Sequence, residues 1–137
     1  MALAKKVTVF DVYDRAKSGP KVDEQDWDNK IIPQTATRLK EKYGIKMDKK
    51  VLIPTDKTLI DNLFKAGLEM LVECGIYCMD TGRVIKYTEE EIMTSLNAAP
   101  SKAILGEGKD AVVLACRSHK DSHPPIIQGG PTGAPVS

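Results

Sequence analysis

The chain has 137 residues, 42% hydrophobic and 28% charged, and a formal net charge of +1. These values predict one soluble globular domain and exclude a coiled coil or a disordered chain. A charge this close to zero gives no electrostatic reason to expect a nucleic acid or an acidic membrane as partner. The sequence contains neither an apolar run long enough for a membrane helix nor a signal peptide, so we expect a cytoplasmic protein.

Two helices are predicted in the first third of the chain. Apolar residues recur at helical spacing over residues 9–16, before a Ser-Gly-Pro break. An acidic turn or short helix is expected at residues 23–28. A longer helix over residues 34–43 follows, with Pro33 able to open it at its first position and Gly44 at its end.

The strongest predicted element is a helix over residues 56–74, where apolar residues recur at steps of three and four. Thr55 or Asp56 can cap its amino end, and Gly75 can take the left-handed conformation at its carboxyl end. Gly67 lies in the middle and costs about 1 kcal/mol of helix stability relative to alanine. It indicates either a close crossing with another element or an ordinary surface position.

Two β-hairpins are expected in the second half. The segments "IYCM" and "RVIKY" flank "DTG", which predicts antiparallel strands at residues 76–79 and 83–87. The segment "KAILGEGKDAVVLACRS" predicts a second hairpin with a strand at residues 111–116. Although "LGEGKD" is rich in glycine, it lacks the spacing of a phosphate-binding loop, so a β-turn is the better interpretation.

A helix over residues 89–97 is predicted between the hairpins. Thr88 and Glu91 have the spacing of a capping box, in which each side chain accepts a hydrogen bond from the backbone of the other residue. The three carboxylates at residues 89–91 also lie at the positive end of the helix dipole. Capping therefore explains this acidic triplet without a catalytic or metal-binding role.

Metal binding is the one chemical alternative that the residues themselves suggest. Soft and borderline zinc ligands are present at Cys74, Cys78, Cys116, His119 and His123, but their spacing is not specific to any zinc motif. Reduced thiols in a cytoplasmic protein are the plainer interpretation, because an odd number of cysteines does not suggest a disulfide framework.

Longer segments show a specific resemblance. "DVYDRAKSGPKVDEQDWDNKIIP", "LKEKYGI", "IPTDKTLIDNLFKAGLEMLVECGIYCMDTGRVIKYTEEEI", "LGEGKDAV" and "IIQGGPTGAPVS" occur in this order. Together they resemble the amino-terminal part of the monomethylamine methyltransferases of methanogens. The resemblance is weaker in "NAAPSKAIL" and "LACRSHKDSHPP", so no family role is carried onto Cys116, His119 or His123.

The resemblance implies an enzyme with a (β/α)8 barrel that moves the methyl group of monomethylamine to the cobalt of a separate corrinoid protein. In that family the ring imine of pyrrolysine holds the amine, and acidic side chains manage its protons. A complete barrel takes about 250 residues, so the family's catalytic residues are expected beyond residue 137. We expect no catalytic residue and no bound cofactor in this chain, which resembles a truncated form or a natural short relative.

The expected fold class is α+β, helices with short antiparallel hairpins that resemble the leading region of the barrel enzyme, the barrel itself being absent. Residues 1–124 are expected to form a cap region, and residues 125–137 a Gly/Pro-rich segment leading toward the barrel. Ile126 and Ile127 are interpreted as the start of a strand. The candidates for substrate binding are Gln128, Gly129, Gly130, Thr132 and Gly133.

The expected partners are a corrinoid protein, other copies of the enzyme and monomethylamine, with no nucleic acid and no membrane. Two alternatives to the enzyme remain open. One is a standalone binding or assembly module that associates with the methyltransferase or corrinoid protein through the helix of residues 56–74. The other is a small zinc or thiol protein.

Overall fold

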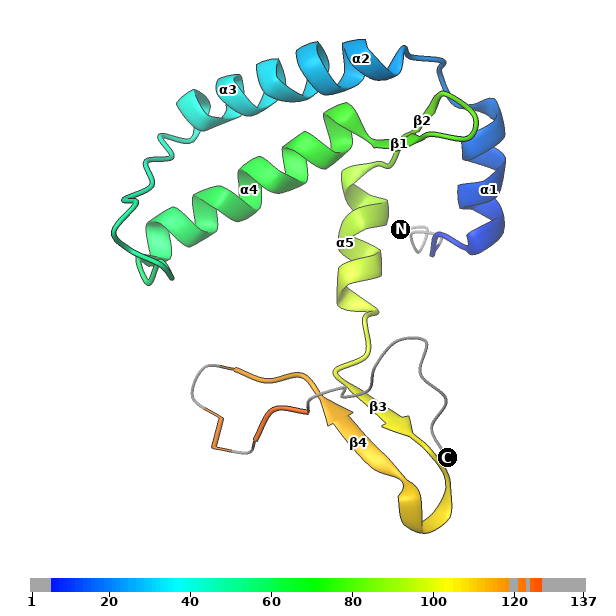
Figure 1. Cartoon of the computed structure of the whole chain (residues 1–137), viewed down its shortest axis with the longest axis vertical. Helices are drawn as coiled ribbons and strands as arrows, with labels where there is room; N and C mark the ends of the chain where they lie inside the picture. The colour runs from blue at the N-terminus through cyan, green and yellow to red at the C-terminus, as the bar shows by residue number, and fades with distance from the viewer. Residues whose placement is uncertain (1–5, 119–120, 123, 127–137) are drawn as a thin grey trace, which may run out of the picture. The chain divides into compact units, whose positions relative to one another are not determined.

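The computed structural model describes residues 6–118, 121–122 and 124–126. The chain divides into two compact units, Met1–Ala98 (unit 1) and Ala99–Ser137 (unit 2) (Figure 1). The described residues form helices and short antiparallel hairpins, as predicted, and show no closed barrel. The division falls inside the expected cap region of residues 1–124. The expected boundary at residue 125 stays a prediction, because most of the segment after it lies outside the described residues.

Helix α1 (Val9–Ser18) confirms the first predicted helix. Thr8 caps its amino end together with Asp11. The Thr8 backbone N–H donates to the Asp11 carboxylate at 2.9 Å, and the Asp11 N–H donates to the Thr8 hydroxyl at 3.3 Å. The helix ends at Gly19, whose N–H donates to the Arg15 carbonyl at 2.7 Å.

The next helical segment is continuous through the position where we expected a new helix to begin. Helix α2 (Glu24–Asp26) passes into the π-helical turn η1 (Trp27–Ile31) and then into α3 (Ile32–Lys42). Pro33 lies in the first turn of α3, as predicted, but α3 is not a separate helix because it continues directly from η1. In an α-helix the proline ring would clash with the carbonyl four residues earlier. The wider turn instead has the Ile32 N–H donating to the Trp27 carbonyl.

Helix α4 (Lys57–Cys74) confirms the strongest predicted element and lies beside α3 (Figure 1). Asp56 is its cap, accepting a hydrogen bond from the Thr58 N–H at 2.9 Å. Gly75 ends the helix, as predicted, with a positive φ of +73°, but its ψ of −159° differs from that of the left-handed helical conformation. The close crossing considered at Gly67 is absent from the described structure, because a Cβ added there would meet no atom within 4 Å.

Strands β1 (Ile76–Cys78) and β2 (Arg83–Ile85) form the first predicted hairpin. The register pairs Ile76 with Ile85, Tyr77 with Val84 and Cys78 with Arg83. The chain between α1 and α2 continues this small sheet, because the Val84 N–H donates to the Pro20 carbonyl at 3.0 Å. The Tyr77 hydroxyl donates to the Val22 carbonyl at 3.1 Å, and the Trp27 and Tyr77 ring centroids lie 5.5 Å apart. Trp27 is thus a packing residue.

Helix α5 (Glu89–Asn97) completes unit 1. Few side chains in the described part of the chain are fully buried, and all of them are apolar and belong to this unit. They are Leu39, Ala66, Cys74, Val84 and Ile85. The core is therefore small and lies where α3, α4 and the first hairpin meet.

Unit 2 contains the second predicted hairpin. Strand β3 (Lys102–Leu105) pairs antiparallel with β4 (Val112–Ala115), and the 3-10 turn η2 (Gly108–Asp110) lies between them. Ile126 is exposed and lies in no strand, while Ile127 lies outside the described residues. Within the described ranges, no helix combines the length and apolar character needed to cross a membrane.

Candidate functional site

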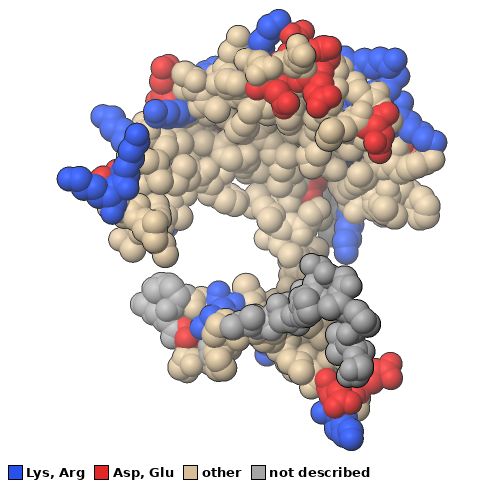
Figure 2. Space-filling view, viewed as in Figure 1, with Lys and Arg blue, Asp and Glu red and all other residues tan. Residues whose placement is uncertain are grey.

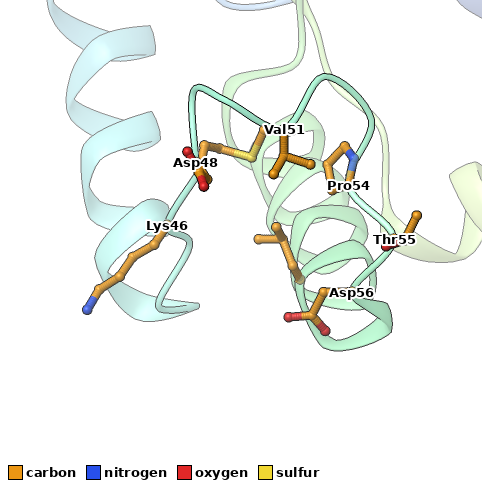
Figure 3. Close-up of a pocket in the computed structure, with 8 residues that line it drawn as sticks. Lys46, Asp48, Val51, Pro54, Thr55 and Asp56 are labelled. Atoms are coloured by element: carbon orange, nitrogen blue, oxygen red, sulfur yellow. The ribbon is translucent and has the colours of Figure 1, made fainter.

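A recess of about 220 Å³ lies where the loop after α3 meets the start of α4 (Figure 3). The loop follows Gly44, whose φ of +60° lets the chain leave α3. Val51 and Pro54 lie over the beginning of α4, whereas Lys46 extends away from it. The full lining is Lys46, Met47, Asp48, Val51, Pro54, Thr55, Asp56 and Leu59.

The acidic groups of this recess already have structural partners. Asp48 accepts a hydrogen bond from the Lys50 N–H at 2.9 Å, which closes a local turn. Asp56 accepts from the Thr58 N–H as the cap of α4. What remains is a mainly apolar hollow that can receive an apolar group. It contains no paired acid and base for catalysis.

An ionic cluster joins α3 to α4. Lys42 donates to Glu69 at 2.6 and 2.7 Å, and the Tyr43 hydroxyl donates to the same carboxylate at 2.7 Å. Arg38 reaches Glu69 at 3.5 Å and also pairs with Glu73. The hydrogen bond from Lys42, followed by that from Tyr43, lowers the pKa of Glu69 to about 2. A carboxylate held ionised in this way positions two helices and cannot donate a proton near neutral pH.

A second ionic cluster joins α1 to α5. The Arg15 guanidinium donates to both oxygens of Glu91, at 2.5 and 3.0 Å, and to the Lys86 carbonyl at 2.9 Å. Glu91 also accepts from the Thr88 N–H at 3.0 Å, while the Glu91 N–H donates to the Thr88 hydroxyl at 3.2 Å. The predicted capping box is confirmed. Its carboxylate additionally ties the two helices together.

The stability of the chain is expected to fall between about pH 5 and pH 2. The Arg15 hydrogen bond, followed by that from Thr88, lowers the pKa of Glu91 to about 2, and the pKa of Glu69 is lowered to the same value. Because both carboxyls have a lower pKa folded than unfolded, their contribution is complete above the unfolded value near 4.5. It is lost as the pH falls toward 2. Urea unfolding of the 137-residue chain, followed by circular dichroism across this range, measures the loss.

The variant Glu91→Gln separates one carboxyl from the rest. At pH 7 the free energy of unfolding of this variant should be about 1 kcal/mol lower than that of the unmodified chain, the usual contribution of a helix cap with a partly exposed ion pair. On acidification from pH 5 to pH 2, the free energy of unfolding of the variant should fall less than that of the unmodified chain. Glu90→Gln is the matched control. Glu90 is in the same turn, but its side chain is exposed and forms no hydrogen bond or ion pair in the described structure. If the free energy of unfolding depends on pH in the same way for both variants, the Glu91 carboxylate is not a source of the acid-dependent stability.

Comparison with known proteins gives the family. A family model described as monomethylamine methyltransferase MtmB matches residues 7–137. The chain belongs to this family. It is 51% identical over 137 residues to MtmB1 of Methanosarcina barkeri, 50% to MtmB of Methanosarcina mazei and 49% to MtmB1 of Methanosarcina acetivorans. Each match covers 100% of this chain and 30% of the relative, so the chain spans under a third of the length of these MtmB proteins.

Solved MtmB structures show the same fold over the matched part. The chain superposes on the crystal structure of the hydroxylamine MtmB complex with a TM-score of 0.86 and 51% identity. The crystal structure of the Methanosarcina barkeri enzyme gives the same two values. Both matches cover 97% of this chain and 29% of the MtmB chain. The resemblance inferred from the sequence is therefore confirmed.

The zinc alternative gains no support within this MtmB segment. Cys74 is buried and Cys78 half-buried in unit 1, whereas Cys116 is exposed in unit 2. In the described ranges, no group of three or more His, Cys, Asp or Glu side chains could hold a metal ion. His119 and His123 lie outside those ranges, so the zinc site stays a prediction.

The substrate-binding candidates of the MtmB segment cannot be placed. Gln128, Gly129, Gly130, Thr132 and Gly133 all lie outside the described residues. Their role also stays a prediction.

The two ionic clusters are what sequence reasoning missed. One signal for the first cluster was present, since two cations and two acids each recur at a spacing of four on neighbouring helices. The pairs are Arg38 with Lys42, and Glu69 with Glu73. For the second cluster there was no comparable signal, because Arg15 and Glu91 are 76 residues apart.

Proposed function

We propose that this chain is the amino-terminal part of an enzyme that transfers the methyl group of monomethylamine to the cobalt of a corrinoid protein. The observation that carries the proposal is 51% identity to Methanosarcina barkeri MtmB1 over all 137 residues, supported by the TM-score of 0.86. Family membership combined with a preserved fold makes the family's reaction the best-supported activity. The proposal includes the (β/α)8 barrel and an oligomeric enzyme.

One of the matched MtmB structures bears on the substrate class. It is a hydroxylamine complex, and hydroxylamine, like monomethylamine, is a nitrogen nucleophile with a single heavy substituent. Both can add to an electrophilic imine. The proposal therefore assigns amine capture to a pyrrolysine imine outside these 137 residues, which improves the leaving ability of the amine.

The described residues serve as scaffold in this proposal. The recess beside α4, of about 220 Å³, is smaller than the roughly 300–1,000 Å³ of ordinary small-molecule sites, and the larger recess of unit 2, of about 770 Å³, is lined mainly by apolar side chains. We assign the corrinoid to a partner protein. The Arg15–Glu91 pair holds α1 to α5, the Lys42–Glu69 pair holds α3 to α4, and α4 contacts α5 within unit 1. This arrangement can form a fixed cap beside the barrel.

A chimaera tests the proposal. The 137 residues would replace the matched segment of Methanosarcina barkeri MtmB1, and methylation of the corrinoid protein by monomethylamine would be followed by visible spectroscopy. The chimaera should methylate the corrinoid at a rate close to that of the parent enzyme, and the 137-residue chain alone should not. A chimaera that folds with the parent's melting temperature but shows no methylation would refute the proposal.

The standalone module remains the second interpretation, and no contact in the described structure favours it. It predicts that the 137-residue chain binds the complete methyltransferase or the corrinoid protein. Size-exclusion chromatography of the mixed proteins distinguishes the standalone module from the enzyme segment.

A further inference from the structure

One face of α4 carries an apolar stripe. Seven residues share this face because they recur at steps of three and four, which return to nearly the same side of a helix with about 3.6 residues per turn. We call them the α4 stripe: Ile60, Leu63, Phe64, Gly67, Met70, Leu71 and Cys74. Figure 2 shows charged side chains gathered along α2, α3 and the loop before α4, while the edge of unit 1 along the first half of α4 is mostly tan.

The described structure covers only the carboxyl-terminal half of the α4 stripe. Cys74 is buried, and Met70 and Leu71 are half-buried. In the other half, Ile60 is 45%, Leu63 36% and Phe64 52% exposed. The hydrogen bonds and ion pairs between the α3 end and α4 run through Asn62, Glu69 and Glu73. All three are more than 100° around the helix from the centre of the stripe, at about 100° per residue, so α3 does not cover this half.

Gly67 is at the centre of the stripe and has no structural reason to be glycine within the described chain. It is exposed and lies in regular helix, and an added Cβ would meet nothing within 4 Å. Alanine would favour the helix about fivefold over glycine. Glycine in the middle of an apolar stripe allows another backbone to approach closely, since interaxial distances depend on the side chains at the crossing.

We propose that the exposed half of the α4 stripe is the docking face for a helix from the part of the MtmB polypeptide that relatives carry beyond the matched 137 residues. That helix would cross α4 at Gly67 and present apolar side chains to Ile60, Leu63 and Phe64. The relatives have further chain from which such a helix can come, because this chain covers only 30% of their length. In the solved MtmB structures the same fold is 29% of a longer chain.

The size of the face favours a covalently linked partner over a second copy. Three partly exposed side chains and a glycine offer on the order of 300 Å². A stable complex between separate proteins needs about 800 Å² from each partner. A small face is sufficient when both parts belong to one chain, because linkage raises their effective concentration. The inference rests on family membership and the relatives' length, so its test needs no methyl transfer.

Gly67→Ala gives the decisive experiment, because it should change the melting temperature in opposite directions in the 137-residue chain and in the chimaera. In the 137-residue chain it should raise the melting temperature by about 5 °C, since the site is open and alanine favours the helix. In the chimaera with Methanosarcina barkeri MtmB1 it should lower the melting temperature, and Gly67→Leu should lower it further. Hydrogen exchange of residues 58–68 should be slower in the chimaera than in the chain alone.

Lys65→Ala is the matched control. Lys65 is exposed on the opposite side of α4 from Gly67, so this change should shift neither melting temperature by more than about 1 °C. If Gly67→Ala raises both melting temperatures, or exchange is equally fast in both proteins, the proposal is overturned. If the 137-residue chain forms dimers that Gly67→Leu dissociates while the chimaera is unaffected, a second copy is the occupant and the proposal is again wrong.

A second format covers a chimaera that does not fold. The tagged 137-residue chain would be co-expressed with the rest of Methanosarcina barkeri MtmB1 and purified through the tag. In this format the face acts together with the other contacts between the two parts of the enzyme, so Gly67→Leu should reduce the recovered partner at least tenfold while Lys65→Ala leaves it unchanged. Equal recovery with the two variants would overturn the proposal.

Discussion

Leu39→Ala is expected to destabilise the 137-residue chain by about 3 kcal/mol, the usual cost of removing a fully buried leucine side chain. Leu39 lies on α3 and is only 2% exposed, one of the two largest fully buried side chains in the described structure. Because the core is small, little other burial can offset the cavity. The free energy of unfolding in urea, monitored by circular dichroism, gives the magnitude.

Leu52→Ala is the matched control, since it removes the same atoms from a side chain that is 95% exposed. This change should alter the free energy of unfolding by at most about 0.5 kcal/mol. Similar losses in the two variants would show that Leu39 is not buried in solution. In that case the packing of α3 on α4 described above would be incorrect.

Gly75→Ala is expected to lower the free energy of unfolding by about 3 kcal/mol for two separate reasons. The first is the backbone, because φ of +73° with ψ of −159° belongs to a region occupied almost only by glycine. The second is space, because an added Cβ would lie 2.5 Å from the Ile85 carbonyl oxygen and 2.7 Å from Val84 Cγ1. Those atoms belong to β2, which is packed against the end of α4 at this point. Thermal and urea unfolding measure the loss.

Gly82→Ala separates the two reasons. Gly82 also has a positive φ, +61°, but the nearest atom to an added Cβ is the Tyr77 hydroxyl oxygen at 3.7 Å. Its cost should be limited to backbone strain, about 1–2 kcal/mol. Gly75→Ala should therefore be the more damaging change by at least about 1 kcal/mol. Equal losses would mean that the helix end and β2 separate easily.

Local signals were sufficient to predict most elements of the fold. The caps at Asp56 and Thr88, the glycine at the end of α4 and the turn between β1 and β2 each depend on a few neighbouring residues. Such features can be derived from one sequence, because the groups that satisfy the helix ends lie within four residues of them. The family resemblance was equally accessible, since it rests on long uninterrupted segments.

Features that depend on distant residues were not predictable in the same way. Arg15 and Glu91 meet only because α1 and α5 are folded together, and neither local sequence indicates the other. The glycine at position 67 suggested a crossing partner that the described chain does not contain. The preference of proline for a helix start correctly placed Pro33 in the first turn of α3, but it gave no sign of the π turn that joins α3 to the helix before it.

The π turn has a consequence for how the family can change in length. A π turn closes over five residues where an α turn closes over four, so it takes up one extra residue locally. Deleting one residue from Trp27–Ile31 should therefore give an ordinary α-helical turn and leave Trp27 and Lys42 facing Tyr77 and Glu69 as before. Pro33 would then lie in regular α-helix, where its ring meets the carbonyl four residues earlier. A relative that is one residue shorter here is therefore expected to lack this proline while keeping the same packing.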